Sequence, residues 1–167
     1  LFPTTIVVLN VGGIMDTAWF CTNPKVQGAL LAGQAGMAGG LAASDILIGD
    51  VNPSGHLAST MAQDFSVYPS SHTFNESESY VEYEEDIYVG YRYFETLPNA
   101  KEKVCYPFGY GLSYTTFKVE QVKTNIKDGI VTVDATITNT GNRAGKAVVQ
   151  AYCEAPQGKL GKAKRVL

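Results

Sequence analysis

The sequence predicts a mixed fold in which an α/β region is followed by an all-β region. In the N-terminal part, short β-branched runs alternate with Gly-rich turns and one segment of helical spacing. After residue 117, apolar and polar residues alternate between turns spaced roughly ten residues apart. The composition, 45% hydrophobic and 17% charged residues, is that of a folded globular protein and excludes a disordered chain. We therefore expect an incomplete parallel α/β layer over about residues 4–50, an aromatic linker region, and an incomplete antiparallel β-sandwich over about residues 117–167.

The N-terminal region contains two predicted strands and one predicted helix. The run TTIVVLNV at 4–11 is rich in β-branched residues and closes on two glycines, which predicts a strand buried on both faces. A second apolar run, VQGALLAG at 26–33, precedes a segment of helical spacing, MAGGLAASDILIGD at 37–50, which Gly49 can end. This order is typical of a parallel α/β layer. Because two strands are fewer than the usual four to six or so, and because Leu1 is not a Met, we expect a piece of a longer protein.

The middle of the chain is predicted to be irregular and then aromatic. Residues 50–80 are rich in Asp, Asn, Pro, Ser and Gly, which predicts a long loop. The stretch YVEYEEDIYVGYRYFE at 80–95 is dense in tyrosines, whose rings combine apolar area with a polar hydroxyl. Such a stretch suits either a half-buried strand pair or a wall beside a polar cleft. PFGYGLSYTTF at 107–117 adds turn residues and further aromatic side chains.

The C-terminal region alternates with the period of two that is typical of strands. FKVEQVKTNI at 117–126 and IVTVDATITNTG at 130–141 flank a Lys-Asp-Gly turn, and AVVQAYCEA at 147–155 repeats the alternation. Three strands are fewer than the about seven that a β-sandwich needs. We therefore expect a large exposed apolar surface, unpaired strand edges and self-association.

Charge and hydropathy exclude several classes of partner. Thirteen basic and sixteen acidic residues give a formal net charge of −3. The basic group Lys159, Lys162, Lys164 and Arg165 is interpreted as a solvated edge, so no nucleic-acid partner is expected. No apolar run reaches the roughly 18 residues of a membrane span, and no secretory signal opens the chain, so no membrane partner is expected. The sequence contains no targeting signal that identifies a compartment, and of the compartments we favour the cytoplasm.

Neither a metal nor a cofactor is expected. Cys21, Cys105 and Cys153 are odd in number and lack metal-ligand spacing, so we expect three reduced thiols and no disulfide framework. The Gly-rich loop GQAGMAGG at 33–40 contains neither the dinucleotide nor the P-loop pattern, which favours close backbone packing over phosphate binding.

The candidates for acid–base or nucleophilic chemistry are weak. Neither His56 nor His72 has an acid or a nucleophile at a sequence spacing that would indicate a Ser-His-Asp arrangement. Crowding of like charges among Glu82, Glu84, Glu85 and Asp86 could raise a pKa, although acidic clusters on surface loops are more often simply solvated.

Four segments in order carry a resemblance to a known family. IGDVNPSGHL at 48–57, YEEDIYVGYRYFET at 83–96, YPFGYGLSYTTF at 106–117 and ITNTGNRAGKAVVQAY at 137–152 resemble glycoside hydrolase family 3 enzymes of the β-glucosidase and β-xylosidase type. The resemblance covers essentially the whole chain. It implies that residues 1–116 are a partial α/β/α sandwich, the C-terminal part of the family's α/β sandwich domain with its aromatic linker. Residues 117–167 would then begin the family's fibronectin type III-like domain, an immunoglobulin-like β-sandwich.

The resemblance implies that the catalytic residues lie outside this chain. The family's (β/α)8 barrel supplies an aspartate nucleophile, and a glutamate acid/base usually precedes the strand that matches residues 4–11. We therefore expect a non-catalytic fragment of a retaining β-glycosidase, which uses a missing barrel domain to release terminal β-linked glucose or xylose from oligosaccharides or β-glucosides. Some family members carry the sandwich and fibronectin-like domains first and the barrel last. The four segments resemble these permuted enzymes, which come from anaerobic gut bacteria.

The resemblance also suggests which residues contact sugar and where the chain departs from the family. In this interpretation Asp45, Trp19 and the aromatic residues at 83–94 shape the domain and the outer wall of the aglycone site. The substrate-binding candidates are Trp19, Glu85 and Tyr91. The family's loop commonly reads GQPGMEGGNALADVL. Here the family's Pro, Glu and Asn are replaced by Ala35, Ala38 and Leu41. The loss of the Glu leaves open altered specificity or an inactive paralogue.

A function of another class is a carbohydrate-binding or adhesion module that presents aromatic rings to a polysaccharide. The PFGYGLSYTTF connection discriminates against it, because the enzyme family uses this segment between domains. A flavodoxin-like nucleotide binder would need a phosphate loop that is not in the sequence.

Overall fold

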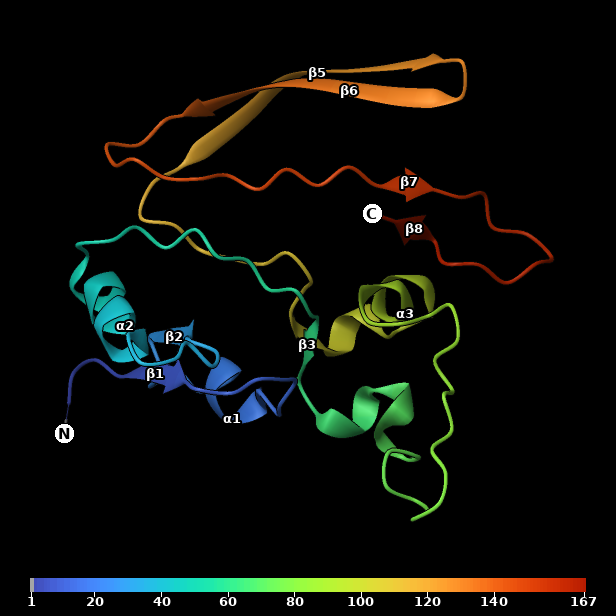
Figure 1. Cartoon of the computed structure of the whole chain (residues 1–167), viewed down its shortest axis with the longest axis horizontal. Helices are drawn as coiled ribbons and strands as arrows, with labels where there is room; N and C mark the ends of the chain where they lie inside the picture. The colour runs from blue at the N-terminus through green and yellow to red at the C-terminus, as the bar shows by residue number, and fades with distance from the viewer. Residues whose placement is uncertain (1) are drawn as a thin grey trace.

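Over residues 2–167, short strands pair two by two and form four separate two-stranded sheets, accompanied by a few short helices (Figure 1). This computed structural model describes residues 2–167. The strands are β1 (Ile6–Leu9), β2 (Gly28–Leu31), β3 (Met61–Ala62), β4 (Val104–Tyr106), β5 (Phe117–Lys127), β6 (Ile130–Asn139), β7 (Cys153–Glu154) and β8 (Arg165–Val166). The α-helices are α1 (Ala18–Cys21), α2 (Gly39–Ile48) and α3 (Tyr91–Thr96). Three 3₁₀ turns span Phe65–Val67, Pro69–Ser71 and Lys101–Lys103.

The predicted parallel strand pair and its helix are confirmed. β1 and β2 pair in parallel from Ile6 opposite Gly28 to Leu9 opposite Leu31. α2 ends at Gly49, whose φ of 87° lies in the left-handed region that glycine favours. The prediction that the first strand is buried on both faces is wrong for this structure. Half of the Ile6 side chain stays exposed, because β1 has only one neighbouring strand.

The core of the chain lies around α3, outside the β1–β2 sheet. Its buried residues are Ala62, Tyr68, Phe94 and Ala100, with Val104 packed against them. Ala62 belongs to β3, which pairs antiparallel with β4. The predicted loop over residues 50–80 therefore contains a two-residue strand and two 3₁₀ turns. Tyr68 lies between these two turns and packs in this core.

Tyr68 connects this core to the backbone through its hydroxyl group. The hydroxyl oxygen accepts a hydrogen bond from the Ala62 N–H at 2.7 Å, and the hydroxyl donates to the Thr60 carbonyl at 2.8 Å. Burial raises the pKa of Tyr68 above its ordinary value of 10.0, and the nearby negative charge of Asp16 acts in the same direction.

Replacing Tyr68 with phenylalanine is expected to lower the free energy of unfolding by about 1–3 kcal/mol at neutral pH, because two buried backbone groups lose their partner. The raised pKa means that the folded state binds this proton more tightly than the unfolded chain does. The stabilisation is therefore complete below pH 10 or so and is lost as the pH rises through the folded-state value. Urea unfolding between about pH 7 and 11 measures both effects. The exposed Tyr80→Phe is the control, and equal losses in the two variants would contradict this account.

The predicted β-hairpin is confirmed, whereas the third predicted strand is wrong. β5 and β6 pair antiparallel around Asp128 and Gly129, which both have positive φ, as a two-residue type I′ turn requires. Of residues 147–155, only Cys153 and Glu154 form a strand, and they pair with β8 rather than with the hairpin. The alternation at 147–155 predicted a strand without identifying its partner.

Two further predictions need correction. Residues 80–95 contain no strand, so a half-buried strand pair is wrong; the segment 80–90 is irregular, and α3 begins at Tyr91. The prediction of three reduced thiols is also wrong. Cys21 and Cys105 form a disulfide with a Cα–Cα distance of 6.5 Å, while Cys153 is free and exposed. The disulfide connects α1 to β4.

The expected exposure of apolar surface is confirmed. Large apolar side chains are exposed on β1, on α2 and along both strands of the hairpin. Self-association through these faces stays a prediction. None of the helices in residues 2–167 is long and apolar enough to cross a membrane.

Candidate functional site

A cavity of about 390 Å³ brings Glu85 and Tyr91, two of the three predicted substrate-binding residues, together. It lies where the loop after β1, the segment before β3 and the start of α3 meet. The residues that line it are Ile14, Ala58, Ser59, Thr60, Tyr68, Glu85, Val89, Gly90, Tyr91, Arg92 and Phe108. The cavity therefore combines an aromatic wall with a carboxylate, a guanidinium and hydroxyl groups.

Glu85 is the member of the predicted acidic cluster that faces this cavity. Its side chain is half-buried, and its Oε1 atom accepts a hydrogen bond from the Ser70 hydroxyl at 3.1 Å. Glu82, Glu84 and Asp86 are exposed. The cluster thus presents one fixed carboxylate to the cavity, and its other acids are directed to solvent.

Tyr91 forms part of the wall of the cavity, and both its ring and its hydroxyl group already have partners within the chain. The ring stacks on Phe108 with centroids 4.8 Å apart and lies edge-on to Tyr152 at 5.8 Å. The hydroxyl oxygen accepts a hydrogen bond from the Leu167 N–H at 2.8 Å. A ligand in the cavity would therefore meet one edge of a rigid aromatic stack.

Trp19, the third predicted residue, does not line this cavity. Its side chain is 52% exposed, its ring lies edge-on to Phe20, and its Nε1 atom donates to the Asp16 carbonyl at 3.0 Å. α1 places it next to Phe20, whose ring stacks on Tyr106. The structure leaves Trp19 apart from the Glu85–Tyr91 site.

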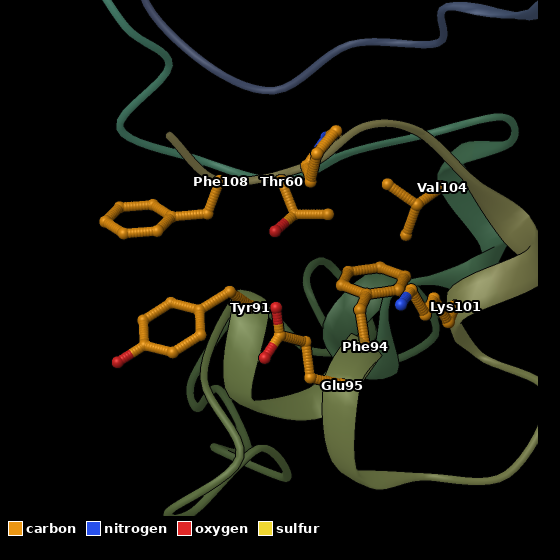
Figure 2. A pocket seen from close by; sticks show the side chains of 8 residues that line it. Thr60, Tyr91, Phe94, Glu95, Lys101, Val104 and Phe108 are labelled. Atoms are coloured by element: carbon orange, nitrogen blue, oxygen red, sulfur yellow. The ribbon is translucent and has the colours of Figure 1, made fainter. Parts of the chain in front are cut away.

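A second, smaller cavity of about 180 Å³ shares Thr60, Tyr91 and Phe108 with the first. Figure 2 shows the Thr60 hydroxyl and the Glu95 carboxylate directed toward the same space, with the Tyr91–Phe108 stack at one side. Thr60 is only 3% exposed, and its Oγ1 atom has no hydrogen-bond partner among residues 2–167. Buried hydroxyl groups are usually paired. The two cavities therefore flank a shared wall that contains an unpaired polar atom.

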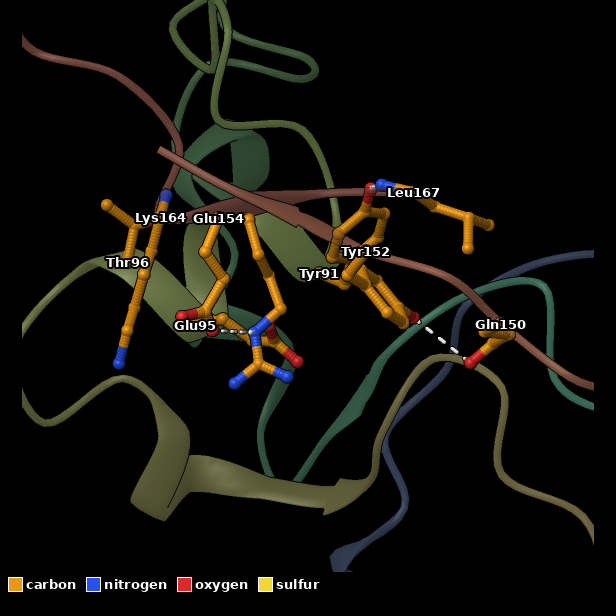
Figure 3. Close-up of polar contacts among 9 residues, drawn as sticks. Tyr91, Glu95, Thr96, Gln150, Tyr152, Glu154, Lys164 and Leu167 are labelled. Atoms are coloured by element: carbon orange, nitrogen blue, oxygen red, sulfur yellow. Dashed lines mark hydrogen bonds and ion pairs between the residues drawn. The ribbon is translucent and has the colours of Figure 1, made fainter. Parts of the chain in front are cut away.

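Glu95 is held by the C-terminal segment (Figure 3). Its Oε2 atom lies 2.8 Å from Nε of Arg165, which is also 3.4 Å from Glu154 Oε1. The Arg165 guanidinium lies over the Tyr152 ring, and burial, with the charge of Glu95 as a smaller cause, raises the pKa of Tyr152. The prediction of a solvated basic edge fits the three exposed lysines and is wrong for Arg165.

Sequence reasoning missed Thr60, Arg92 and Glu95. For Glu95 a signal existed, because it follows Tyr91 by four residues and the two therefore share one face of α3. For Thr60 no local signal existed. Its place beside Phe108 depends on the antiparallel pairing of β3 with β4.

The loop at 33–40 lies at the carboxyl ends of the two parallel strands, away from the residues that line either cavity. Its Gln34 side chain packs closely against Gly12 in the loop after β1, where an added Cβ would lie 3.0 Å from Gln34 Cδ. Ala35, Ala38 and Leu41, the positions that depart from the family pattern, are exposed. Among residues 2–167, no three His, Cys, Asp or Glu side chains cluster as metal ligands would.

The sequence model of the Glycosyl hydrolase family 3 C-terminal domain matches residues 1–114. The chain belongs to glycosyl hydrolase family 3. The resemblance drawn from the four segments is thereby confirmed. Domain limits at 116 and 117 stay a prediction, as do the roles of Trp19, Glu85 and Tyr91 in binding sugar.

Several relatives of this family 3 chain are named as β-glucosidases. Beta-glucosidase A of Butyrivibrio fibrisolvens is 52% identical over 182 aligned positions, which cover 99% of this chain and 22% of that protein. A Beta-glucosidase of Ruminococcus albus is 45% identical, with 99% of this chain and 17% of that protein covered. A solved beta-glucosidase from Paenibacillus barengoltzii has a TM-score of 0.86 at 46% identity, covering 98% of this chain and 18% of that one. The chain thus spans about a fifth of the length of these relatives.

Proposed function

We propose that this chain is a non-catalytic part of a retaining β-glycosidase that releases terminal β-linked glucose or xylose. The family match over residues 1–114 and the similarity to beta-glucosidases support the class of reaction. In this proposal residues 1–116 are the C-terminal part of the α/β sandwich domain. Residues 117–167 begin the fibronectin type III-like domain, and the β5–β6 hairpin supports this second assignment.

The observation that carries the role of this fragment is the cavity that holds Glu85 beside the Tyr91–Phe108 stack. A half-buried carboxylate accepts hydrogen bonds from sugar hydroxyl groups, and an apolar aromatic wall packs against sugar C–H groups. Arg92 lines the same cavity and carries a positive charge that balances the negative charge of Glu85. A neutral, hydroxyl-rich group fits this combination better than an ion does.

The chain's contribution to the reaction is binding and orientation of the leaving-group side of the substrate. Retaining hydrolysis needs a nucleophile and an acid/base, and the positions that match the family's pair lie outside these residues. Contacts to the leaving group that are equal in the ground state and the transition state lower KM and leave kcat unchanged. Glu85 is therefore expected to affect KM.

In the full-length protein, Glu85→Gln is expected to raise KM for an oligosaccharide about fivefold with kcat unchanged, because one charge-assisted hydrogen bond of about 1 kcal/mol is weakened. The glutamine keeps an oxygen that can accept from Ser70. Glu84→Gln is the matched control, since Glu84 is exposed in the same segment. Steady-state kinetics on an oligosaccharide and on an aryl glucoside measure the effect.

Equal kinetics for Glu85→Gln and Glu84→Gln would remove Glu85 from the substrate site. An equal loss in kcat and kcat/KM would instead assign it a role in the transition state. A full-length protein that binds oligosaccharides without turnover would favour the binding module or inactive paralogue over the hydrolase.

A further inference from the structure

Asn52, in the loop after α2, uses its side-chain amide to join two segments that are far away in the sequence. Its Oδ1 atom accepts hydrogen bonds from the Tyr114 N–H at 2.8 Å and from the Ser113 hydroxyl at 3.0 Å. Its Nδ2 atom donates to the Ala144 carbonyl at 2.9 Å. One side chain therefore contacts both the connection before β5 and the turn after β6.

The segment that begins at Asn52 and the segment that ends at Tyr114 run side by side to the core. Beyond Asn52, the Leu57 N–H donates to the Tyr110 carbonyl at 2.8 Å, and the Gly109 N–H donates to the Leu57 carbonyl at 2.7 Å. The pairing of β3 with β4 continues the same arrangement. Residues 52–62 and 104–114 thus form one antiparallel ribbon, with Asn52 at one end and β3–β4 at the other.

The register of this ribbon determines the wall of the candidate site. Thr60 lies on one segment and Phe108 on the other, and both line the two cavities. Tyr91 takes its position by stacking on Phe108. A slip of the ribbon would move Phe108 and with it the aromatic edge that faces Glu85.

On its other side, Asn52 holds the turn that follows the hairpin. A Cβ atom added to Gly145 would come within 2.7 Å of Asn52 Nδ2, so this turn packs closely on the amide. The guanidinium of Arg143 donates to the Gly49 carbonyl and lies over the Tyr114 ring. The turn after the hairpin and the end of the ribbon therefore contact each other around Asn52.

We propose that Asn52 is a positioning residue with two separable roles. Its carbonyl oxygen fixes the register of the ribbon and, through Phe108, the geometry of the candidate site. Its amide nitrogen fixes the turn at 143–145 and so the orientation of the β5–β6 hairpin. The kinetic consequence rests on the proposed function, whereas the structural consequence does not.

Two substitutions separate these roles. Asn52→Asp keeps an oxygen that can accept from Tyr114 and loses the donor to Ala144, whereas Asn52→Ala loses both. Asn142→Ala is the control, because Asn142 is exposed in the same turn. The readouts, in the full-length protein, are amide hydrogen exchange at Tyr114 and Gly109, tryptic cleavage after Arg143, and KM and kcat on an oligosaccharide.

Asn52→Ala is expected to raise exchange at Tyr114 and Gly109 about tenfold and to raise KM severalfold at unchanged kcat. The Tyr114 N–H loses its acceptor, and the Gly109 N–H, which donates to Leu57, lies in a ribbon that opens more readily once its end contact at Asn52 is lost. Asn52→Asp is expected to restore both values while cleavage after Arg143 increases in both variants. Unchanged exchange at Gly109 in Asn52→Ala would overturn the ribbon role, and unchanged cleavage in Asn52→Asp would overturn the hairpin role. If the full-length protein turns over no glycoside, the proposed function fails, and exchange and cleavage alone decide this proposal. If Asn52→Ala does not fold, Ser113→Ala replaces it with the same expected direction at Tyr114.

Discussion

Replacing Phe94 with alanine is expected to lower the free energy of unfolding of the chain by about 3–5 kcal/mol. Phe94 is only 2% exposed, and its ring lies edge-on to Tyr68 at 5.4 Å and to Tyr93 at 5.1 Å. The substitution removes the transfer free energy of a buried ring and leaves a cavity that its aromatic neighbours cannot close. Because the core contains few other buried residues, this loss approaches the whole stability of a small domain.

Urea unfolding followed by circular dichroism, at one protein concentration for all variants, measures this loss. Phe74→Ala is the matched control, because Phe74 has the same side chain and is 70% exposed. The control is expected to change the free energy of unfolding by less than about 0.5 kcal/mol. If both variants unfolded at the same urea concentration, the cluster around Phe94 would not be the core in solution.

Elements whose signal is local were predicted from the sequence. The parallel strands, the helix that ends at Gly49 and the hairpin at Asp128–Gly129 each depend on residues within a short window. Period, glycine position and turn chemistry are all visible in such a window. These signals do not depend on the rest of the fold.

Elements whose partner is distant in the sequence were not predicted. The run at 147–155 alternates as a strand does, yet only two of its residues pair, because their partner β8 lies in the final residues. Cys21 and Cys105 are 84 residues apart in the sequence, so the odd number of cysteines and the spacing between them could not reveal this disulfide. At 80–95 the abundance of tyrosine suited either a strand pair or a wall beside a polar cleft, whereas α3 places Tyr91, Phe94 and Glu95 at helical spacing.

The candidate site was predicted in part for the same reason. Glu85 and Tyr91 are six positions apart in one segment, so a motif that contains both keeps them together. Thr60 and Arg165 reach the site only through β3–β4 pairing and the packing of the C-terminal segment on α3. Trp19 was grouped with the site for its residue type alone, and the structure places it apart.

The 167-residue chain by itself is expected to show no turnover of aryl β-glucosides above the uncatalysed rate. Double displacement needs two carboxyl groups about 5–5.5 Å apart, one as nucleophile and one as acid/base. Within the acidic cluster only Glu85 faces the larger cavity, since Glu82, Glu84 and Asp86 are exposed. Glu95, which lines the smaller cavity, is paired with Arg165.

Positioning is the second reason to expect an inactive chain. Holding the reactants in the correct geometry can contribute about 7–11 kcal/mol of barrier reduction, and the proposed barrel that would hold the sugar is not part of these residues. A single carboxylate beside an open aromatic wall therefore lacks both its chemical partner and most of the rate enhancement. The assay compares the purified chain, its Glu85→Gln variant and the full-length protein on a fluorogenic β-glucoside. Hydrolysis by the chain that Glu85→Gln abolishes would place the chemistry within these residues, whereas hydrolysis by the full-length protein alone is the expected result.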